Sequence, residues 1–366
     1  MKKFQSYIVS VIFGLLLFLG GITLFFMPHK EYSEAERRPL AEAPDVSVKT
    51  VWDGSFFSNA DKWVTDHFQF REAFRHIKAE WQIHILGEEN NDFVYVDGSV
   101  IKLERTVNEY SLDYAAERFG NVYDSFLKDT NCKIYCALIP DKSFFLRDGG
   151  YPVMDFEKME VIYQDMLPGA TPISIKDELQ LNDYYNTDSH WKQECIVTAA
   201  NKLISAMQDD FKPLKTSDFI NYTYEPFDGV YSGQSALYPA PDVITYLSND
   251  ILAGCRVIDF GAMKEIPMYD SENCDSRDPY TLFLGGSKGY LQIENPNVST
   301  GKDLVVFRDS FGSSIAPLLV TQYSTVTLID IRYIHPTIIR QYMQFDHQDV
   351  LFLYSAILMN NSQGLN

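Results

Sequence analysis

The chain has 366 residues, of which 46% are hydrophobic and 14% aromatic, so it can bury a substantial core and is not a wholly disordered protein. Its formal net charge is -19 and no basic stripe is visible, which argues against nucleic acid as a partner and favours a neutral substrate such as a sugar polymer. Its five cysteines include no Cys-x-x-Cys pair, so neither a disulfide framework nor a zinc site is predicted, although Cys255 and Cys274 could pair.

The amino-terminal segment is apolar. After Lys2 and Lys3, an uncharged run from about Tyr7 to Met27 is long enough for a helix to cross a hydrocarbon core of roughly 30 Å. A buried helix of the soluble domain and a cleaved signal peptide are the alternatives, but the run ends without the small residues of a cleavage site. We therefore predict a cytoplasmic tip and transmembrane signal anchor over residues 1–28, which places the rest of a single-pass cell-membrane protein outside the cytoplasm.

The next two segments differ in polarity. Residues 29–50 are polar and contain prolines, which predicts an extracytoplasmic tether. Over residues 52–86, aromatic and aliphatic side chains recur mostly at three- and four-residue spacing, which predicts an amphipathic helical segment. We place this segment at the start of a main domain over residues 51–366.

The main domain alternates strand and helix patterns. The Asp97-Gly98 turn between two β-rich runs predicts a hairpin over residues 93–103. A helix over about residues 113–127 is followed by short apolar strands that helical patterns mostly separate, as expected for an α/β sandwich with a mainly parallel sheet covered on both faces. The predicted strands are 133–139, 172–175, 304–307, 325–329 and 350–354. Residues from about 214 to 302 are rich in Tyr, Asn, Gly and Pro, and predict a β- or loop-rich insertion.

One candidate for chemistry is Ser310. It follows an apolar strand, and a helical apolar stretch begins just after it. A serine at this edge of an α/β sheet lies where ligands bind, and the free N–H groups of a helix start can stabilise an oxyanion. The alternative is that Asp309 or Ser310 only caps the helix.

A second candidate is the pair Asp188 and His190, which precedes a helical stripe that begins near Ile196. A carboxylate two residues from a histidine can bond its Nδ1–H and direct Nε2 toward a hydroxyl. The alternative is an N-cap at Asp188 or Ser189 beside a partly buried histidine. Because Ser310 needs a base and His190 needs a nucleophile, we predict a Ser310–His190–Asp188 triad. No spacing predicts a metal site, a nucleotide loop or any cofactor.

These residues resemble a known family. The segments Asp66-His67-Phe-Gln-Phe-Arg71, Asp188-Ser-His190-Trp191 and Arg308-Asp-Ser310-Phe are similar to those of the DHHW proteins, SGNH-hydrolase-like relatives of the alginate O-acetylation proteins. The resemblance extends over nearly the whole chain and includes Ile139-Pro-Asp141-Lys142-Ser143 and Phe283-Leu-Gly-Gly-Ser287. It implies an SGNH-hydrolase-like three-layer α/β/α sandwich in which the triad falls on Asp188, His190 and Ser310.

The resemblance also implies an activity, namely transfer or removal of an acetyl ester on a cell-surface or secreted polysaccharide, beside a membrane-bound O-acyltransferase that supplies acetyl groups. A non-catalytic polysaccharide-binding or assembly scaffold is the alternative, because the abundant tyrosines of the insertion, such as Tyr222, Tyr224, Tyr231 and Tyr238, would suit sugar stacking.

The implied oxyanion or substrate contacts are Phe311, Ser287 and Arg332. Two positions depart from the family pattern: Arg308 stands in place of glycine, and Ser287 in place of asparagine. Asp66 and His67 are expected to be structural.

Overall fold

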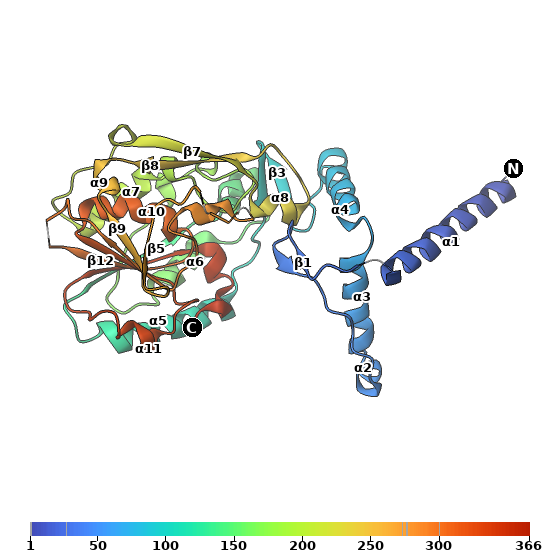
Figure 1. The fold of residues 1–366 in the computed structure, drawn as a ribbon, viewed down its shortest axis with the longest axis horizontal. Helices are drawn as coiled ribbons and strands as arrows, with labels where there is room; N and C mark the ends of the chain where they lie inside the picture. The colour runs from blue at the N-terminus through green and yellow to red at the C-terminus, as the bar shows by residue number, and fades with distance from the viewer. Residues whose placement is uncertain (1, 27, 273, 276, 300) are drawn as a thin grey trace. The chain divides into compact units, whose positions relative to one another are not determined.

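The computed structural model describes residues 2–26, 28–272, 274–275, 277–299 and 301–366. They form two compact units, one made of Met1–Asn91 with Val230–Tyr238 and the other of Asp92–Gly229 with Pro239–Asn366 (Figure 1). The aromatic segment 52–86, which the sequence placed in the main domain, therefore belongs to the amino-terminal unit together with a short piece of the insertion.

The amino-terminal unit is mainly helical. Its elements are α1 (Lys2–Phe26), β1 (Tyr32–Ser33), β2 (Arg38–Pro39), α2 (Val48–Trp52), α3 (Ser55–His67), α4 (Arg71–Glu80), the π-helical turn η1 (Trp81–Leu86) and α8 (Val230–Ser235). The predicted aromatic segment is thus several helices rather than one. Left-handed backbone at Gly54 (φ 82°) and Phe70 (φ 62°) stands immediately before α3 and α4 and breaks the helical path.

The predicted signal anchor falls on α1, except for Met27, which lies outside the described residues. In the described part of the chain, no helix is long and apolar enough to cross a membrane, so the structure does not support the predicted transmembrane helix.

Asp66 and His67 tie the amino-terminal unit together. The Asp66 carboxylate accepts two hydrogen bonds from the guanidinium of Arg38, at 2.6 and 2.9 Å. The two ring nitrogens of His67 contact the carbonyl oxygens of Trp63 at 2.9 Å and Lys30 at 3.1 Å. Both side chains hold separate segments of one unit in place, which is the structural role expected for them.

The Asp66–Arg38 pair leads to a pH prediction. The hydrogen bond from Arg38 lowers the pKa of Asp66 to about 2, whereas an unfolded aspartate titrates near about 3.9. A depressed carboxyl pKa stabilises the fold above the unfolded pKa, and this contribution is lost as the pH falls through the folded pKa. We expect the wild type to lose its stability advantage over Asp66→Asn between about pH 4 and pH 2, as urea unfolding would show. The control Asp61→Asn, on the exposed side of α3, should show no such pH dependence. A difference in unfolding free energy between the wild type and Asp66→Asn that stays constant from about pH 4 to pH 2 would contradict the assignment.

The second unit is built on a mixed sheet. Its eight strands run in the order β10-β9-β11-β13-β12-β14-β5-β6, and the neighbouring pairs from β13 to β6 are parallel, whereas those from β10 to β13 are antiparallel. The strands of this unit, with its two hairpins, are β3 (Phe93–Val96), β4 (Ser99–Lys102), β5 (Lys133–Ile139), β6 (Thr171–Pro172), β7 (Ile220–Phe227), β8 (Asp242–Ser248), β9 (Arg256–Asp259), β10 (Lys264–Ile266), β11 (Tyr290–Glu294), β12 (Asp303–Arg308), β13 (Thr325–Ile329) and β14 (Asp349–Ser355). The predicted α/β fold with a mainly parallel sheet is confirmed, although the structure has only the two-residue β6 where strand 172–175 was predicted, and the two overlap at Pro172 alone.

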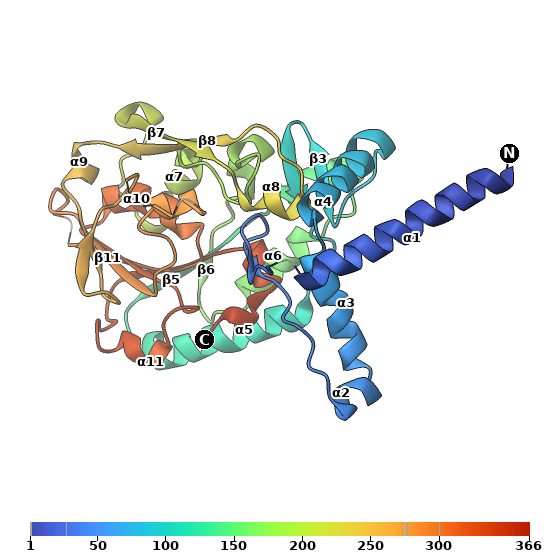
Figure 2. The ribbon, with the colours of Figure 1, turned by 45° about the vertical axis from the view of Figure 1, so that its right-hand side comes forward.

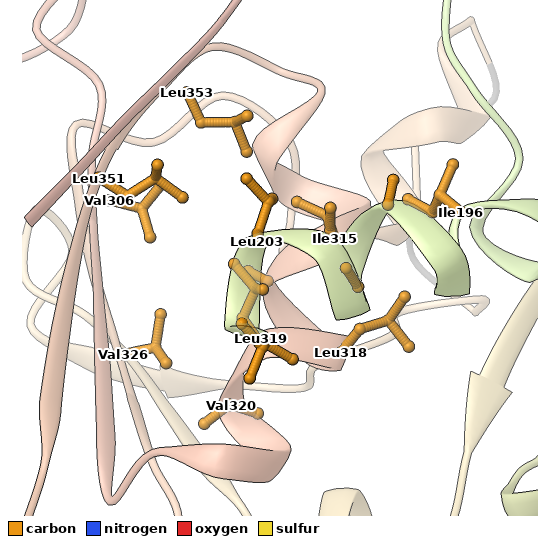
Figure 3. Close-up of a cluster of buried hydrophobic side chains, with 14 of the residues drawn as sticks. Ile196, Leu203, Val306, Ile315, Leu318, Leu319, Val320, Val326, Leu351 and Leu353 are labelled. Carbon is orange, nitrogen blue, oxygen red and sulfur yellow. The ribbon is translucent and has the colours of Figure 1, made fainter. Parts of the chain in front are cut away.

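Helices cover both faces of this sheet. They are α5 (Glu109–Val122), α6 (Phe156–Gln164), α7 (Val197–Met207), α9 (Asp250–Ala253), α10 (Gly312–Leu319), α11 (Pro336–Ile339) and α12 (Ala356–Met359). Both views place α7 and α10 on one side of the strands and α5 on the other (Figure 1 and Figure 2). Because side chains alternate along a strand, each central strand supplies two separate cores. Val306 and Leu351 face Leu203 of α7 and Ile315 of α10 (Figure 3), while Phe307 packs into the core on the α5 side.

The predicted hairpin and insertion both form. Asp97 and Gly98 take positive φ values of 50° and 83° between β3 and β4, as a two-residue hairpin turn requires. The insertion has two parts. Strands β7 and β8 pair only with each other, whereas β9, β10 and β11 add three antiparallel strands to one edge of the main sheet. The insertion is therefore β-rich, and much of it is an extension of the core rather than a separate module.

Candidate active site

Ser310 lies between the end of β12 and the start of α10, at the carboxyl end of the central parallel strands. The buried carboxylate of Asp309 shapes this turn. Its Oδ1 accepts a hydrogen bond from the backbone N–H of Phe311 at 3.0 Å, and its Oδ2 accepts one from the backbone N–H of Ser355 at 2.8 Å. Because Ser355 ends β14, Asp309 joins the ends of two adjacent strands and leaves the Ser310 hydroxyl partly exposed at the sheet edge.

His190 and Asp188 stand beside this serine. The Nε2 atom of His190 lies 2.7 Å from Ser310 Oγ, and its Nδ1 atom lies 2.6 Å from Asp188 Oδ1. Asp188 is 1% exposed, and the side chain of His190 is 15% exposed. An ionised carboxylate only accepts hydrogen bonds, so Nδ1 carries the proton and Nε2 is free to take the proton of the serine. The structure thus brings together the three side chains that the sequence selected, in the order that base catalysis requires.

The sequence predicted that the Asp188–His190 pair lies at the entry of a helix. The structure places the pair in a loop instead. A β-bridge joins Tyr184 and Trp191, and the backbone N–H of Tyr185 donates to the carbonyl of His190 at 3.0 Å. The helix α7 begins only at Val197. The helical stripe was read correctly from Val197 onward, but the tight loop ahead of it is held by long-range contacts that a local pattern does not show.

The buried side chain of Lys142 contacts the backbone carbonyl groups of this loop. Lys142 is 2% exposed, and its Nζ lies within hydrogen-bonding distance of the carbonyl oxygens of Val100 (2.7 Å), Tyr185 (2.7 Å), Asn186 (3.2 Å) and Asp188 (3.1 Å), which share its three N–H donors. Burial lowers the pKa of Lys142 to about 7, and the charges of Asp188 and of nearby Asp242 oppose this shift. Three of the four acceptors belong to the segment that carries Asp188, so Lys142 fixes the backbone of the proposed acid.

Asp242 supports the same loop from the insertion. Its two carboxylate oxygens accept hydrogen bonds from the backbone N–H groups of Asn186 (3.0 Å) and Thr187 (2.7 Å), and Oδ2 also accepts from the Thr187 hydroxyl at 2.7 Å. Gly229 passes so close that a Cβ atom there would lie 2.3 Å from the Thr187 carbonyl oxygen. The loop is therefore fixed on its carbonyl side by Lys142 and on its N–H side by Asp242.

Replacing the buried lysine tests this arrangement. In Lys142→Met the aliphatic chain remains, but the carbonyl groups around Nζ lose the three N–H donors that they share, so we expect the free energy of unfolding to fall by about 3 kcal/mol. Acetate release should fall as well, because the backbone of Asp188 is no longer fixed. Chemical denaturation and an esterase assay measure the two effects. Lys158→Met, which removes only a surface ion pair with Glu109, should change neither; wild-type stability in Lys142→Met would contradict the proposed role.

Two residues close to His190 form hydrogen bonds with the start of α10, the helix that follows Ser310. The indole Nε1–H of buried Trp191 donates to Ser314 Oγ at 2.8 Å and lies 3.2 Å from the carbonyl oxygen of Phe311. The side-chain amide of Gln193 donates to the Ser314 carbonyl at 2.7 Å. The loop that carries His190 and the helix that follows Ser310 are thus joined by buried hydrogen bonds, which maintain the 2.7 Å contact between His190 and Ser310.

Comparison with known proteins gives a consistent result. The family model of the DHHW proteins matches residues 180–329, a range that contains Asp188, His190 and Ser310. A DHHW family protein from Eubacterium siraeum aligns in structure with a TM-score of 0.61 at 19% identity, over 74% of this chain and 93% of that one. The predicted resemblance to DHHW proteins is confirmed.

Other solved structures share the fold. Bacillus cereus PatB1, in a structure with a sulfonyl adduct, aligns with a TM-score of 0.60 at 18% identity, over 73% of this chain and 95% of that one. The O-acetyltransferase domain of Pseudomonas putida AlgJ aligns with a TM-score of 0.44 at 12% identity, over 73% of this chain and 92% of that one, which is too distant to argue from. Among curated proteins, none matches this sequence.

The first departure from the DHHW pattern, Arg308, is accommodated inside the fold. Its side chain is fully buried, and Nη1 donates to the Asp309 carbonyl at 3.2 Å and to Ser313 Oγ at 3.0 Å. Burial lowers the pKa of Arg308, while the charge of Asp330, 4.0 Å away, favours the charged form. A Cβ atom at position 312 would lie 2.7 Å from Arg308 Cβ, so Gly312 makes room for this arginine.

The predicted oxyanion and substrate contacts, Phe311, Ser287 and Arg332, are more dispersed. The backbone N–H of Phe311 already donates to Asp309. Ser287 is exposed in the bend that precedes β11. The guanidinium of Arg332 makes two hydrogen bonds to Asp330, at 2.6 and 2.9 Å, and although burial opposes the charge, Asp330 raises the pKa of Arg332. These three assignments stay predictions.

The cysteines and possible metal ligands give no further chemistry. Cys255 and Cys274, which could have paired, are both free thiols. Burial raises the pKa of the Cys136 thiol to about 12, which makes it unreactive. Within the residues described, no group of three His, Cys, Asp or Glu side chains could hold a metal ion.

Proposed function

We propose that this chain is a serine O-acetyltransferase or acetylesterase that acts on a polysaccharide through an acetyl-Ser310 intermediate. The observation that carries the proposal is the continuous contact from Asp188 through His190 to Ser310, at 2.6 and 2.7 Å. The DHHW resemblance and the fold shared with PatB1 agree with it. The net charge of -19 favours a neutral rather than an anionic polymer as substrate.

The proposed reaction has two halves. In the first, His190 Nε2 takes the proton from Ser310 Oγ as this oxygen attacks the acetyl carbonyl, and the same proton then passes to the leaving oxygen of the donor. In the second, His190 takes a proton from a sugar hydroxyl or from water as that oxygen attacks the acetyl-serine, and then returns the proton to Ser310 Oγ as the serine leaves. Transferase and esterase differ only in this acceptor. The ionised Asp188 stabilises the imidazolium in both halves.

Two further parts of the proposal concern its setting. A membrane-bound O-acyltransferase would supply the acetyl groups, and the second unit would work outside the cytoplasm on a cell-surface or secreted polymer. The partner rests on the family resemblance, and the location rests on the apolar amino-terminal run from about Tyr7 to Met27. Cell fractionation, combined with co-purification of the full chain with its membrane partner, tests them; recovery of the chain in the cytosol alone would contradict both.

The experiment for the activity uses p-nitrophenyl acetate as donor and a neutral oligosaccharide as acceptor. We expect p-nitrophenol release above the background of the Ser310→Ala variant, with acetylated sugar detected by mass spectrometry if the chain is a transferase and free acetate if it is an esterase. No release above that background, with or without the sugar, would contradict the proposal.

A second candidate function is a non-catalytic polysaccharide-binding scaffold. It is favoured by Tyr222, which is 46% exposed and stacks on Tyr246 in the β7–β8 hairpin, with ring centroids 5.4 Å apart. Tight calorimetric binding of the oligosaccharide by a chain without esterase activity would favour the scaffold.

A further inference from the structure

Tyr280 makes an unexpected contact with the proposed base. It lies on the short 3-10 turn Pro279–Leu282 of the insertion and is 3% exposed. Its ring is stacked on the imidazole of His190, with centroids 3.9 Å apart and planes only 15° from parallel. Phe311 also contacts this imidazole, with centroids 4.7 Å apart. His190 is thus enclosed by aromatic rings from the insertion and from the turn after the nucleophile.

The position of Tyr280 is itself fixed. Its hydroxyl donates to Ser314 Oγ at 2.8 Å, and the same oxygen accepts the indole N–H of Trp191 at 2.8 Å. Ser314 lies on α10, directly behind the nucleophile. One buried hydroxyl therefore sets the distance between the stacked tyrosine, the residue after the base and the helix after Ser310.

From this geometry we infer that Tyr280 is a positioning residue that holds the His190 imidazole face-on while it exchanges a proton with Ser310. The contacts of Nδ1 with Asp188 and of Nε2 with Ser310 hold the edge of the imidazole, but neither packs against its faces, so the ring can still tilt. A parallel ring at 3.9 Å prevents this tilt. The face of a buried aromatic ring also attracts a cation, so the stack stabilises the imidazolium that forms when Ser310 gives up its proton.

This inference rests on the proposed function, and it assigns the insertion a part in it. The insertion would then contribute to the active site itself, because it supplies the ring that stacks on His190. It would not serve only as a binding surface remote from the site. The ring and the hydroxyl of Tyr280 can be separated by mutation, because Tyr280→Phe keeps the stack and loses the bond to Ser314, whereas Tyr280→Leu loses both.

The test compares kcat and KM for p-nitrophenyl acetate in these variants. We expect Tyr280→Leu to lower kcat by about 30-fold with little change in KM, as loss of a buried cation–π contact would. Tyr280→Phe and Ser314→Ala keep the stacked ring and lose only the hydrogen bond that fixes it, so each should lower kcat measurably but far less than Tyr280→Leu. Tyr280→Met is a second ringless variant in case the leucine variant does not fold. Tyr342→Leu, which removes a ring from the aromatic group of Phe260 and Tyr290, is the matched control and should keep kcat.

Equal losses in Tyr280→Phe and Tyr280→Leu, or an unchanged kcat in Tyr280→Leu, would overturn the inference. A second readout separates it from the proposed function. Ring-current shifts of the His190 imidazole protons in NMR spectra should be upfield in the wild type and in Tyr280→Phe but lost in Tyr280→Leu. If the wild type has no esterase activity, the proposed function fails, and these shifts alone decide whether the stack exists; identical shifts in all variants would refute it.

Discussion

Ser310→Ala is expected to abolish p-nitrophenyl acetate hydrolysis, with kcat/KM falling by at least about 10³-fold. The Ser310 hydroxyl lies 2.7 Å from His190 Nε2, and alanine leaves the base without a group to deprotonate. His190→Ala should cause a loss of similar size. The double variant should be no worse than either single variant, because residues of one proton-transfer unit do not act additively.

The matched control for this prediction is Ser205→Ala. Ser205 is exposed on α7, where its hydroxyl only bonds the carbonyl of Lys202. Circular dichroism should show native folding for all variants. Residual activity of Ser310→Ala near the wild-type level would mean that acetate release occurs at another site.

Asp188→Asn is expected to lower kcat by about 10³- to 10⁴-fold while the fold is kept. Asparagine has the shape of aspartate, but its amide can donate to Nδ1. The imidazole then keeps its proton on Nε2, where it faces Ser310 Oγ and cannot accept a proton. The loss of the negative charge also leaves the imidazolium without a counter-ion. A steady-state assay beside a thermal melt measures both activity and folding.

Asp183→Asn provides the comparison for Asp188→Asn. Asp183 is a buried carboxylate five positions earlier in the same segment, and it accepts a hydrogen bond from the Gln180 backbone N–H at 2.8 Å rather than from a histidine. The variant Asp183→Asn should reduce kcat far less than Asp188→Asn does. If the two variants lose activity equally, the effect of Asp188 comes from loop stability and not from the tautomer of His190.

Much of the fold followed from local patterns. The strand Lys133–Ile139 was predicted to the residue, since it is a buried apolar run that ends at a proline, and the Asp97-Gly98 turn gave the hairpin. The breaks at Gly54 and Phe70 were missed because spacing of aromatic residues continues across them. The edge strands β9 to β11 were missed as parts of the main sheet, since pairing between distant segments leaves no periodic signal.

The site was predictable where chemistry depends on residue type and spacing. An Asp-x-His pair and a serine after a strand restrict the candidates, and the structure brings these three side chains together. The groups that support them were not found, because they are ordinary residues whose role depends on long-range contacts. Lys142 was only part of a family pattern, and Tyr280 was one of 23 tyrosines. The sequence offered one signal for Lys142, a lysine close after a predicted apolar strand in Ile139-Pro-Asp-Lys142, but only the structure shows its burial.

The most direct test of the account is covalent labelling of Ser310. The full chain would be treated with a sulfonyl fluoride, digested and mapped by mass spectrometry, with His190→Ala and Ser310→Ala in parallel. The account predicts a sulfonyl group on Ser310 in the wild type, much slower labelling in His190→Ala and none at this position in Ser310→Ala. An unlabelled Ser310 in the folded wild type, or labelling that proceeds at the same rate without His190, would contradict the claim that His190 activates Ser310 as a nucleophile.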